Sequence, residues 1–244
     1  MINIKLTVEY DGTNYAGWQR QKNASTIQQK VEEAITLITG EEIEVIGSSR
    51  TDAGVHARGY VCNFNTSTNI AQEKYSNAIN SKLPKDIVIL NSIEVDNSFH
   101  SRYNSKGKTY SYTILNREKS PAMYRNYFYH YKSKINVAYM ESACKEFVGM
   151  HDFEAFRNLG SSVKTTTRTI KDIHIENKED IIKIFITADG FLYNMARIIS
   201  GTLLDVGIGK VKPEEIKYII DSKDRTKAGR SLPPQGLCLE KVFY

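Results

Sequence analysis

The segment GSSRTDAGVHARG, residues 47–59, places a single carboxylate among several basic side chains. Asp52 has Arg50 before it and His56 and Arg58 after it. A carboxylate that neighbouring cations keep ionised can act as a nucleophile or as a general base. The same residues also fit an ordinary loop in which Asp52 caps its own turn. Composition alone does not decide between these two interpretations.

Arg197 is a second candidate, because it lies in a segment expected to form a helix over residues 191–206. Apolar and aromatic side chains fall on nearly every face of that helix, which is typical of a buried helix: Phe191, Tyr193, Met195, Ile198, Ile199, Leu203, Leu204 and Val206. A buried guanidinium requires an anion, and Asp52 is the candidate partner. The alternative is that Arg197 reaches the surface or pairs with a structural acid.

A strand expected over residues 109–115 supplies the third candidate group. Side chains alternate along a strand, so Lys108, Tyr110 and Tyr112 share one face. Tyrosines on a sheet face usually pack in the core, but beside basic residues they also stack on nucleobases. The chain has 15 tyrosines and a net charge of +5, which favours an RNA partner without requiring one.

Several classes of chemistry have no signature in the sequence. The five histidines lack metal-ligand spacing, and we find no P-loop, no G-x-G-x-x-G and no G-x-S-x-G motif. We therefore expect a redox-neutral reaction that uses no metal and no cofactor. Three widely spaced cysteines argue against a disulfide framework, and no apolar run approaches the ~18 residues of a membrane span. We expect a cytoplasmic protein without a membrane partner.

Hydrophobic periodicity predicts β-α-β-β-α-β in the first half, with strands near residues 2–10, 43–46, 60–64 and 87–95 and helices at 26–39 and 71–82. Ser25 is the expected N-cap of the first helix and Gly40 its stop. The second half repeats this architecture with additions: strands at 109–115, 127–131, 168–175, 181–187 and 237–243, and helices at 137–147, 191–206 and 213–220. This order is the split βαβ, or ferredoxin-like, pattern.

We therefore expect an α+β fold built from two ferredoxin-like halves, residues 1–105 and 106–244, without a linker between them. The first half would carry the Asp52 loop, and the second half the tyrosine strand and the Arg197 helix. Their sheets would be mixed, mostly antiparallel, and would flank a central basic cleft. A cleft between domains is a common place for a binding site.

Five segments resemble, in order, the motif series of the tRNA pseudouridine synthase A family: EYDGTNYAGWQRQ, SSRTDAGVHARGYV, FHSRY with KTYSY, MHDFEAF and GFLYNMARIISGTL. Together they span nearly the whole chain, and RTDAGVHA is the most specific of them. The resemblance implies a homodimer that binds tRNA in a basic cleft and uses neither metal nor cofactor. Such an enzyme isomerises uridine to pseudouridine at positions 38 to 40 of the anticodon stem-loop.

The resemblance also assigns roles to residues. Asp52 matches the catalytic aspartate, and Arg50 matches an arginine that assists base flipping. Tyr110 would contact the target base, Arg197 would pair with the aspartate, and Leu237 would line the uracil pocket. Asp52 could attack C1′ and release uracil, or it could take a proton from C2′ and form a glycal. The sequence leaves both routes open.

Other interpretations remain at this stage. A non-catalytic RNA-binding module could use the same fold with exposed aromatic side chains. A glycosidase or nucleoside hydrolase also acts at C1′ but typically needs two carboxylates, whereas the Asp52 loop offers one. Elsewhere, Arg20 and Gln21 are candidate RNA contacts, and the segment 151–153 is expected to be a structural turn.

Overall fold

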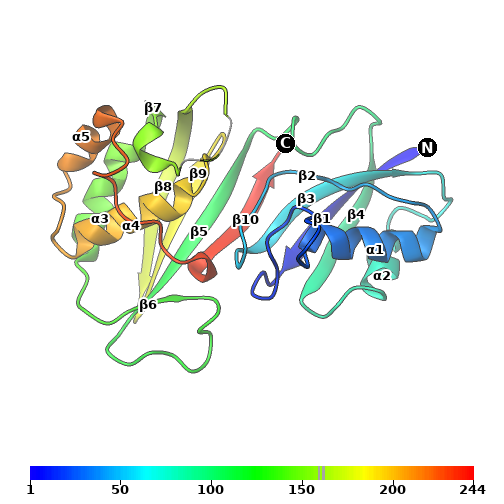
Figure 1. Cartoon of the computed structure of the whole chain (residues 1–244), viewed down its shortest axis with the longest axis horizontal. Helices are drawn as coiled ribbons and strands as arrows, with labels where there is room; N and C mark the ends of the chain where they lie inside the picture. The colour runs from blue at the N-terminus through cyan, green and yellow to red at the C-terminus, as the bar shows by residue number, and fades with distance from the viewer. Residues whose placement is uncertain (159, 161–162) are drawn as a thin grey trace. The chain divides into compact units, whose positions relative to one another are not determined.

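The structure is a computed structural model that describes residues 1–158, 160 and 163–244 (Figure 1). It is a mixed α+β fold in which most strand pairs are antiparallel, as the sequence predicts. Its contacts divide the chain into two compact units. Unit 1 comprises residues 1–106 together with 238–244, and unit 2 comprises residues 107–237. From Cys238 onward, the final strand therefore belongs to the same unit as the N-terminal half.

The sheet of unit 1 contains β1 (Ile2–Tyr10), β2 (Ile46–Gly47), β3 (His56–Thr66), β4 (Ile87–Val95) and β10 (Leu237–Phe243). β1 lies between β4 and β3 and is antiparallel to both. β10 runs parallel to the start of β3, where Cys238 is opposite His56. β2 pairs further along β3, where Gly47 is opposite Cys62. Two short strands therefore pair with β3, and one of them, β2, directly precedes the segment that contains Asp52.

β2 begins later than the strand predicted at residues 43–46. The apolar side chains of Ile43 and Val45 are buried there, but the Val45 N–H donates to Glu32 Oε1 at 3.1 Å. A backbone donor that binds a carboxylate does not serve a sheet ladder. This side-chain bond explains why the strand pattern in the sequence does not become a strand.

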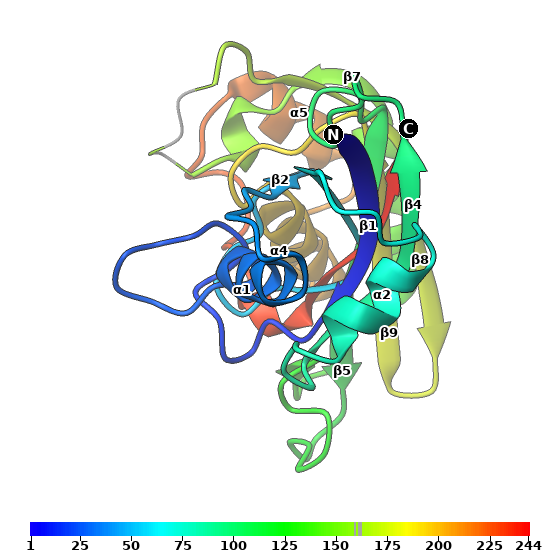
Figure 2. The same ribbon diagram turned by 90° about the vertical axis from the view of Figure 1, so that its right-hand side faces the viewer.

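Two helices complete unit 1, α1 (Ile27–Thr39) and α2 (Lys74–Asn80). Thr26, not the predicted Ser25, caps α1, because its hydroxyl accepts the Gln29 N–H at 3.4 Å. Gly40 ends α1 as predicted, with a left-handed φ of 73°. α2 is shorter than predicted, packs on β4 and contacts α1 (Figure 2).

The sheet of unit 2 contains β5 (Gly107–Asn116), β6 (Tyr129–Tyr131), β7 (Gly149–Asp152), β8 (Thr167–Lys178) and β9 (Ile181–Ala188). β5, β9, β8 and β7 follow one another as antiparallel neighbours, and β6 runs parallel to β5. The predicted hairpin of β8 and β9 is confirmed. The prediction of a turn at residues 151–153 is wrong in part, because residues 149–152 form strand β7, which pairs with the first residues of β8.

Three helices pack in unit 2: α3 (Val137–Cys144), α4 (Met195–Gly207) and α5 (Glu215–Ser222). α4 contacts both α3 and β5 (Figure 1). Nearly all of its residues are buried, which confirms the prediction of a buried helix. It starts at Met195 rather than at Phe191, because Asn194 has a left-handed φ of 61°. Asn adopts that conformation more readily than most residues, and Tyr193 before it is exposed.

Candidate active site

The Asp52 loop lies in unit 1, between β2 and β3, and Asp52 itself is half-buried. The residue before it is fixed on both sides. Thr51 Oγ1 is 2.8 Å from the Tyr10 hydroxyl, and the Thr51 carbonyl accepts the Trp18 N–H at 3.1 Å. After it, the Val55 N–H donates back to the Asp52 carbonyl at 3.2 Å and closes a tight turn. The backbone that carries the candidate carboxylate is therefore held in place.

The loop between β1 and α1 packs directly against the Asp52 loop. Gly17 has a φ of 96°, and a Cβ built on it would lie 2.4 Å from the Thr51 carbonyl oxygen. Only glycine fits such a backbone and such an approach. Trp18 is buried, and its ring stacks on Tyr60 with centroids 3.9 Å apart, so Trp18 packs in the core of unit 1.

His56 is buried and joins the two loops. Its Nδ1 lies 3.1 Å from the Gly12 N–H donor and 3.1 Å from Asp11 Oδ1. Asp11 also accepts the Thr13 N–H at 2.9 Å, which closes a turn directly after β1. The sequence showed His56 only as one more base near Asp52. The structure makes it a contact of Asp11, which no spacing in the sequence indicated.

The two arginines close to Asp52 in the sequence, Arg50 in the loop and Arg58 on β3, differ in their contacts. Arg58 pairs with Glu240 of β10, with Nη1 3.1 Å from Oε1. Arg50 is exposed at the surface of unit 1. Of these two arginines, Arg58 therefore already pairs with a carboxylate, that of Glu240.

Tyr110 lies on β5 in unit 2, opposite Ile186 of β9. Its side chain is 7% exposed, and its ring meets Phe191 edge to face with centroids 4.8 Å apart. Such an edge contact fixes the plane of the tyrosine ring. The adjacent Tyr112 on the same face is fully buried and donates its hydroxyl to the Pro233 carbonyl at 2.8 Å.

Arg197 is half-buried on the first turn of α4. Its Nε donates to the Leu232 carbonyl at 2.6 Å, and Nη1 donates to Asn194 Oδ1 at 2.7 Å. Two bonds thus set the direction of the guanidinium. The left-handed Asn194 that delays the helix also supplies one of these acceptors.

Leu237 is buried at the start of β10, directly after the segment LPPQG. Arg197 holds the first residue of that segment, Leu232, and Tyr112 holds Pro233. Gly236 passes so close that a Cβ on it would lie 2.6 Å from Tyr112 Cζ. The structure therefore brings Arg197 and the tyrosine strand together around the segment that leads to Leu237.

The candidate residues fall into two groups. Asp52 and Arg50 belong to unit 1, whereas Tyr110, Arg197 and Leu237 belong to unit 2. Within the described residues, no group of three or more metal-ligating side chains comes together. Over the same residues, no helix has both the length and the apolar character needed to cross a membrane.

Comparison with known proteins gives the class of the protein. The family model of tRNA pseudouridine synthase matches residues 6–104 and 143–244, and the chain belongs to this family. It is an enzyme of tRNA modification, an isomerase that converts uridine in tRNA to pseudouridine.

Full-length relatives agree. A tRNA pseudouridine synthase A 2 of Clostridium perfringens is 63% identical over all of both chains. The tRNA pseudouridine synthase A proteins of Clostridium acetobutylicum and Clostridium kluyveri are 57% and 55% identical, again over all of both chains. The family that the sequence motifs resemble is thereby confirmed.

Proposed function

We propose that Asp52 is the catalytic carboxylate and that it acts on uridines at positions 38 to 40 of the anticodon stem-loop of tRNA. The observation that supports this most directly is the fixed backbone on both sides of Asp52, from Thr51 to Val55. A group that must meet one atom of a flipped nucleotide has to be held in a defined position. The specific motif RTDAGVHA surrounds the same residue.

The reaction exchanges one bond for another. The N1–C1′ bond breaks, the uracil turns, C5 bonds to C1′, C5 loses a proton and N1 gains one. Substrate and product contain the same atoms in the same oxidation state. Asp52 either attacks C1′ and is later displaced by C5, or removes a proton from C2′ to give a glycal. Both routes need the ionised carboxylate.

Arg197 is proposed as the cation that keeps Asp52 ionised, since a nearby guanidinium favours the charged form of a carboxylate. Its two bonds to Leu232 and Asn194 fix it for such a pairing. Tyr110 would lie against the uracil ring and Leu237 would line the pocket. Arg50, exposed on the Asp52 loop, would take the place of the base that leaves the stack, a step that costs a few kcal/mol.

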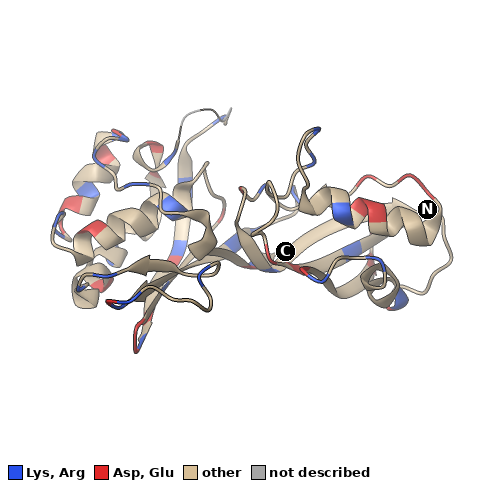
Figure 3. Ribbon diagram, turned by 60° about the horizontal axis from the view of Figure 1, so that its bottom comes forward, with Lys and Arg blue, Asp and Glu red and all other residues tan. Residues whose placement is uncertain are grey.

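The proposed architecture is two ferredoxin-like halves, residues 1–105 and 106–244, around a basic cleft. In the first half, the connection β1-α1-β2-β3-α2-β4 and the order β4-β1-β3-β2 support the ferredoxin-like assignment. Lysine and arginine recur along loops and helices of both units (Figure 3), and they outnumber acidic residues by 33 to 28. This modest excess suits a polyanionic substrate.

We also propose a homodimer, because two copies offer an L-shaped tRNA more separate basic contacts than one copy does. Sedimentation at working concentration, with and without tRNA, tests the assembly. A fully active monomer would refute the dimer.

Site-resolved pseudouridine mapping of tRNA transcripts tests the function. We expect new pseudouridine only at positions 38 to 40, and none with Asp52→Asn. Modification elsewhere would overturn the site specificity. Binding of tRNA without any conversion would instead favour an RNA-binding module.

A further inference from the structure

The loop between β1 and α1 carries an arginine whose setting suggests a further contact with tRNA. Arg20 lies two residues after Trp18, whose N–H binds the carbonyl of Thr51, the neighbour of Asp52. The Arg20 N–H donates to Gln28 Oε1 at 3.0 Å on the first turns of α1. The Arg20 backbone is therefore tied to α1, and the same segment is tied to the Asp52 loop two residues earlier, at Trp18.

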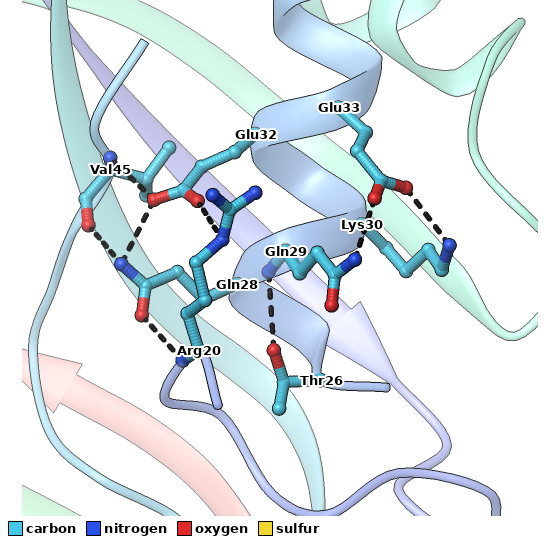
Figure 4. A network of polar contacts seen from close by, with 8 residues as sticks. All are labelled: Arg20, Thr26, Gln28, Gln29, Lys30, Glu32, Glu33 and Val45. Atoms are coloured by element: carbon cyan, nitrogen blue, oxygen red, sulfur yellow. Dashed lines mark hydrogen bonds and ion pairs between the residues drawn. The ribbon is translucent and has the colours of Figure 1, made fainter. Parts of the chain in front are cut away.

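The side chain of Arg20 rests on a buried acid. Glu32 of α1 is 5% exposed, and its Oε2 lies 3.1 Å from Arg20 Nε (Figure 4). Its other oxygen, Oε1, accepts the Val45 N–H at 3.1 Å and Gln28 Nε2 at 2.9 Å. Three donors thus surround one carboxylate. Glu32 cannot turn away from Arg20 without giving up two further hydrogen bonds.

This arrangement uses one edge of the guanidinium and leaves the other for a ligand. The contact engages Nε, while the Arg20 side chain as a whole is 56% exposed. Guanidinium is planar and carries five N–H donors. When Nε is held, the two terminal nitrogens are fixed in direction, and their fork matches the oxygens of a phosphate.

The neighbouring Gln21 behaves differently. Its Nε2 donates back to the Ala16 carbonyl at 3.0 Å, so its amide serves the loop itself. The sequence indicated Arg20 and Gln21 equally as RNA contacts. The structure favours Arg20.

A role in stability alone explains the Glu32 pair less well. Removing a carboxylate from water is costly, and a buried ion pair often adds nothing to stability compared with apolar residues. The same helix carries a more exposed pair for comparison, Lys30 and Glu33, whose side chains are 36% and 43% exposed, with 2.9 Å between Nζ and Oε2. A buried acid that faces an exposed arginine is better suited to orienting that arginine.

We propose that Glu32 is a positioning residue that holds Arg20 to bind a backbone phosphate of tRNA close to the Asp52 loop. The proposal rests on tRNA being the substrate, and its second part rests on the proposed role of Asp52. The proposed contact lies on unit 1 but outside the Asp52 loop, in the segment between β1 and α1.

Glu32→Gln is the decisive variant, because the amide oxygen can keep the place of Oε1 and both of its bonds. The amide NH₂ then replaces Oε2 and faces Arg20 Nε, donor against donor. This change releases Arg20 and adds one unit of positive charge to the protein. A simple charge effect would tighten tRNA binding, whereas loss of orientation weakens it.

The experiment measures tRNA affinity between about 50 and 300 mM salt, together with kcat and KM, for wild type, Arg20→Ala, Glu32→Gln, the double variant and Lys30→Ala. We expect Arg20→Ala to weaken binding about fivefold to tenfold and to lower the salt slope by about one. Glu32→Gln should give a smaller loss of the same kind, mainly in KM. The double variant should match Arg20→Ala, because Glu32 acts through Arg20.

Lys30→Ala should leave affinity and salt slope unchanged. Tighter binding by Glu32→Gln, an additive double variant, or equal losses with Lys30→Ala would overturn the proposal. Thermal unfolding of each variant identifies any that lose structure. Because wild-type conversion is measured in the same assays, failure of the enzymatic function is seen separately from failure of the Arg20 contact.

Discussion

Arg197 and Leu232 are joined by two hydrogen bonds, one in each direction. Arg197 Nε donates to the Leu232 carbonyl at 2.6 Å, and the Leu232 N–H donates to the Arg197 carbonyl at 3.3 Å. The first turn of α4 and the segment leading to Leu237 therefore form one piece. A change at Arg197 acts on both.

Arg197→Met tests the role of this connection between Arg197 and Leu232. Methionine keeps the length of the stem but has no donor, so the charge and the bond to Leu232 are both lost. We expect kcat to fall by about 100-fold or more, as when one donor to a developing charge is removed. Lys210→Met is the matched control, because Lys210 is an exposed cation just after α4, and its Nζ lies 3.7 Å from Oδ1 of Asp205 in that helix. Near-normal turnover by Arg197→Met would remove Arg197 from the site.

Asp52→Asn should abolish isomerisation while tRNA binding stays near wild type. The amide has the shape of the carboxylate but cannot act as nucleophile or base. Single-turnover conversion and filter binding, measured side by side, check this. Asp96→Asn, an exposed loop acid that binds its own turn at Ser98, should remain active. Asp52 would be structural if its variant lost binding as strongly as turnover.

Tyr110 and Tyr112 should respond differently to phenylalanine. Tyr110→Phe keeps the ring that meets Phe191, so we expect intact binding and a lower kcat. Tyr112→Phe leaves the Pro233 carbonyl without its hydroxyl donor, so we expect a loss of about 1 kcal/mol in the free energy of unfolding. Denaturant unfolding and kcat, measured on both variants, separate the two roles. A drop in kcat for Tyr112→Phe alone would reverse the assignment.

Arg50→Ala should impair a structured stem-loop more than an already unpaired oligonucleotide, because the proposed task of Arg50 is to help the base leave its stack. The measurement is kcat/KM on the two substrates. Arg58→Ala serves as the control, since Arg58 is also exposed but pairs with Glu240. Equal losses on both substrates would exclude a role in flipping.

Lowering the pH should reduce the stability of unit 2, because Asp152 becomes protonated. Burial raises the pKa of this carboxyl, but hydrogen bonds from Lys223, Thr166 and the Glu154 N–H outweigh it, and the pKa lies below its usual value. A lowered folded-state pKa gives stability above the unfolded pKa of about 4, and that stability is lost as pH falls through the folded pKa.

Asp152→Asn should therefore destabilise the protein at pH 7 and make less difference at acidic pH. Urea midpoints at both pH values measure this difference. Glu118→Gln, in an exposed pair with Lys119, should show no such pH dependence. A constant difference for Asp152→Asn at all pH values would contradict the prediction.

Local patterns in the sequence were sufficient for most elements. Alternating apolar residues predicted β1 and β4 to the residue, and the apolar faces around Arg197 predicted a buried helix. The prediction failed where a side chain takes a backbone donor or changes the backbone. Glu32 takes the Val45 N–H, and Asn194 turns left-handed before α4.

The amino-acid sequence by itself determined the family, the α+β class and the candidate residues, because these depend on residue types in fixed local order. Only the tertiary structure decided their partners. Arg58 binds Glu240, 182 positions away, and Arg197 binds Leu232, 35 positions away. A carbonyl or a carboxylate that is distant in the chain leaves no periodic signal near the residue that binds it. Such contacts arise only when the strands and helices have packed.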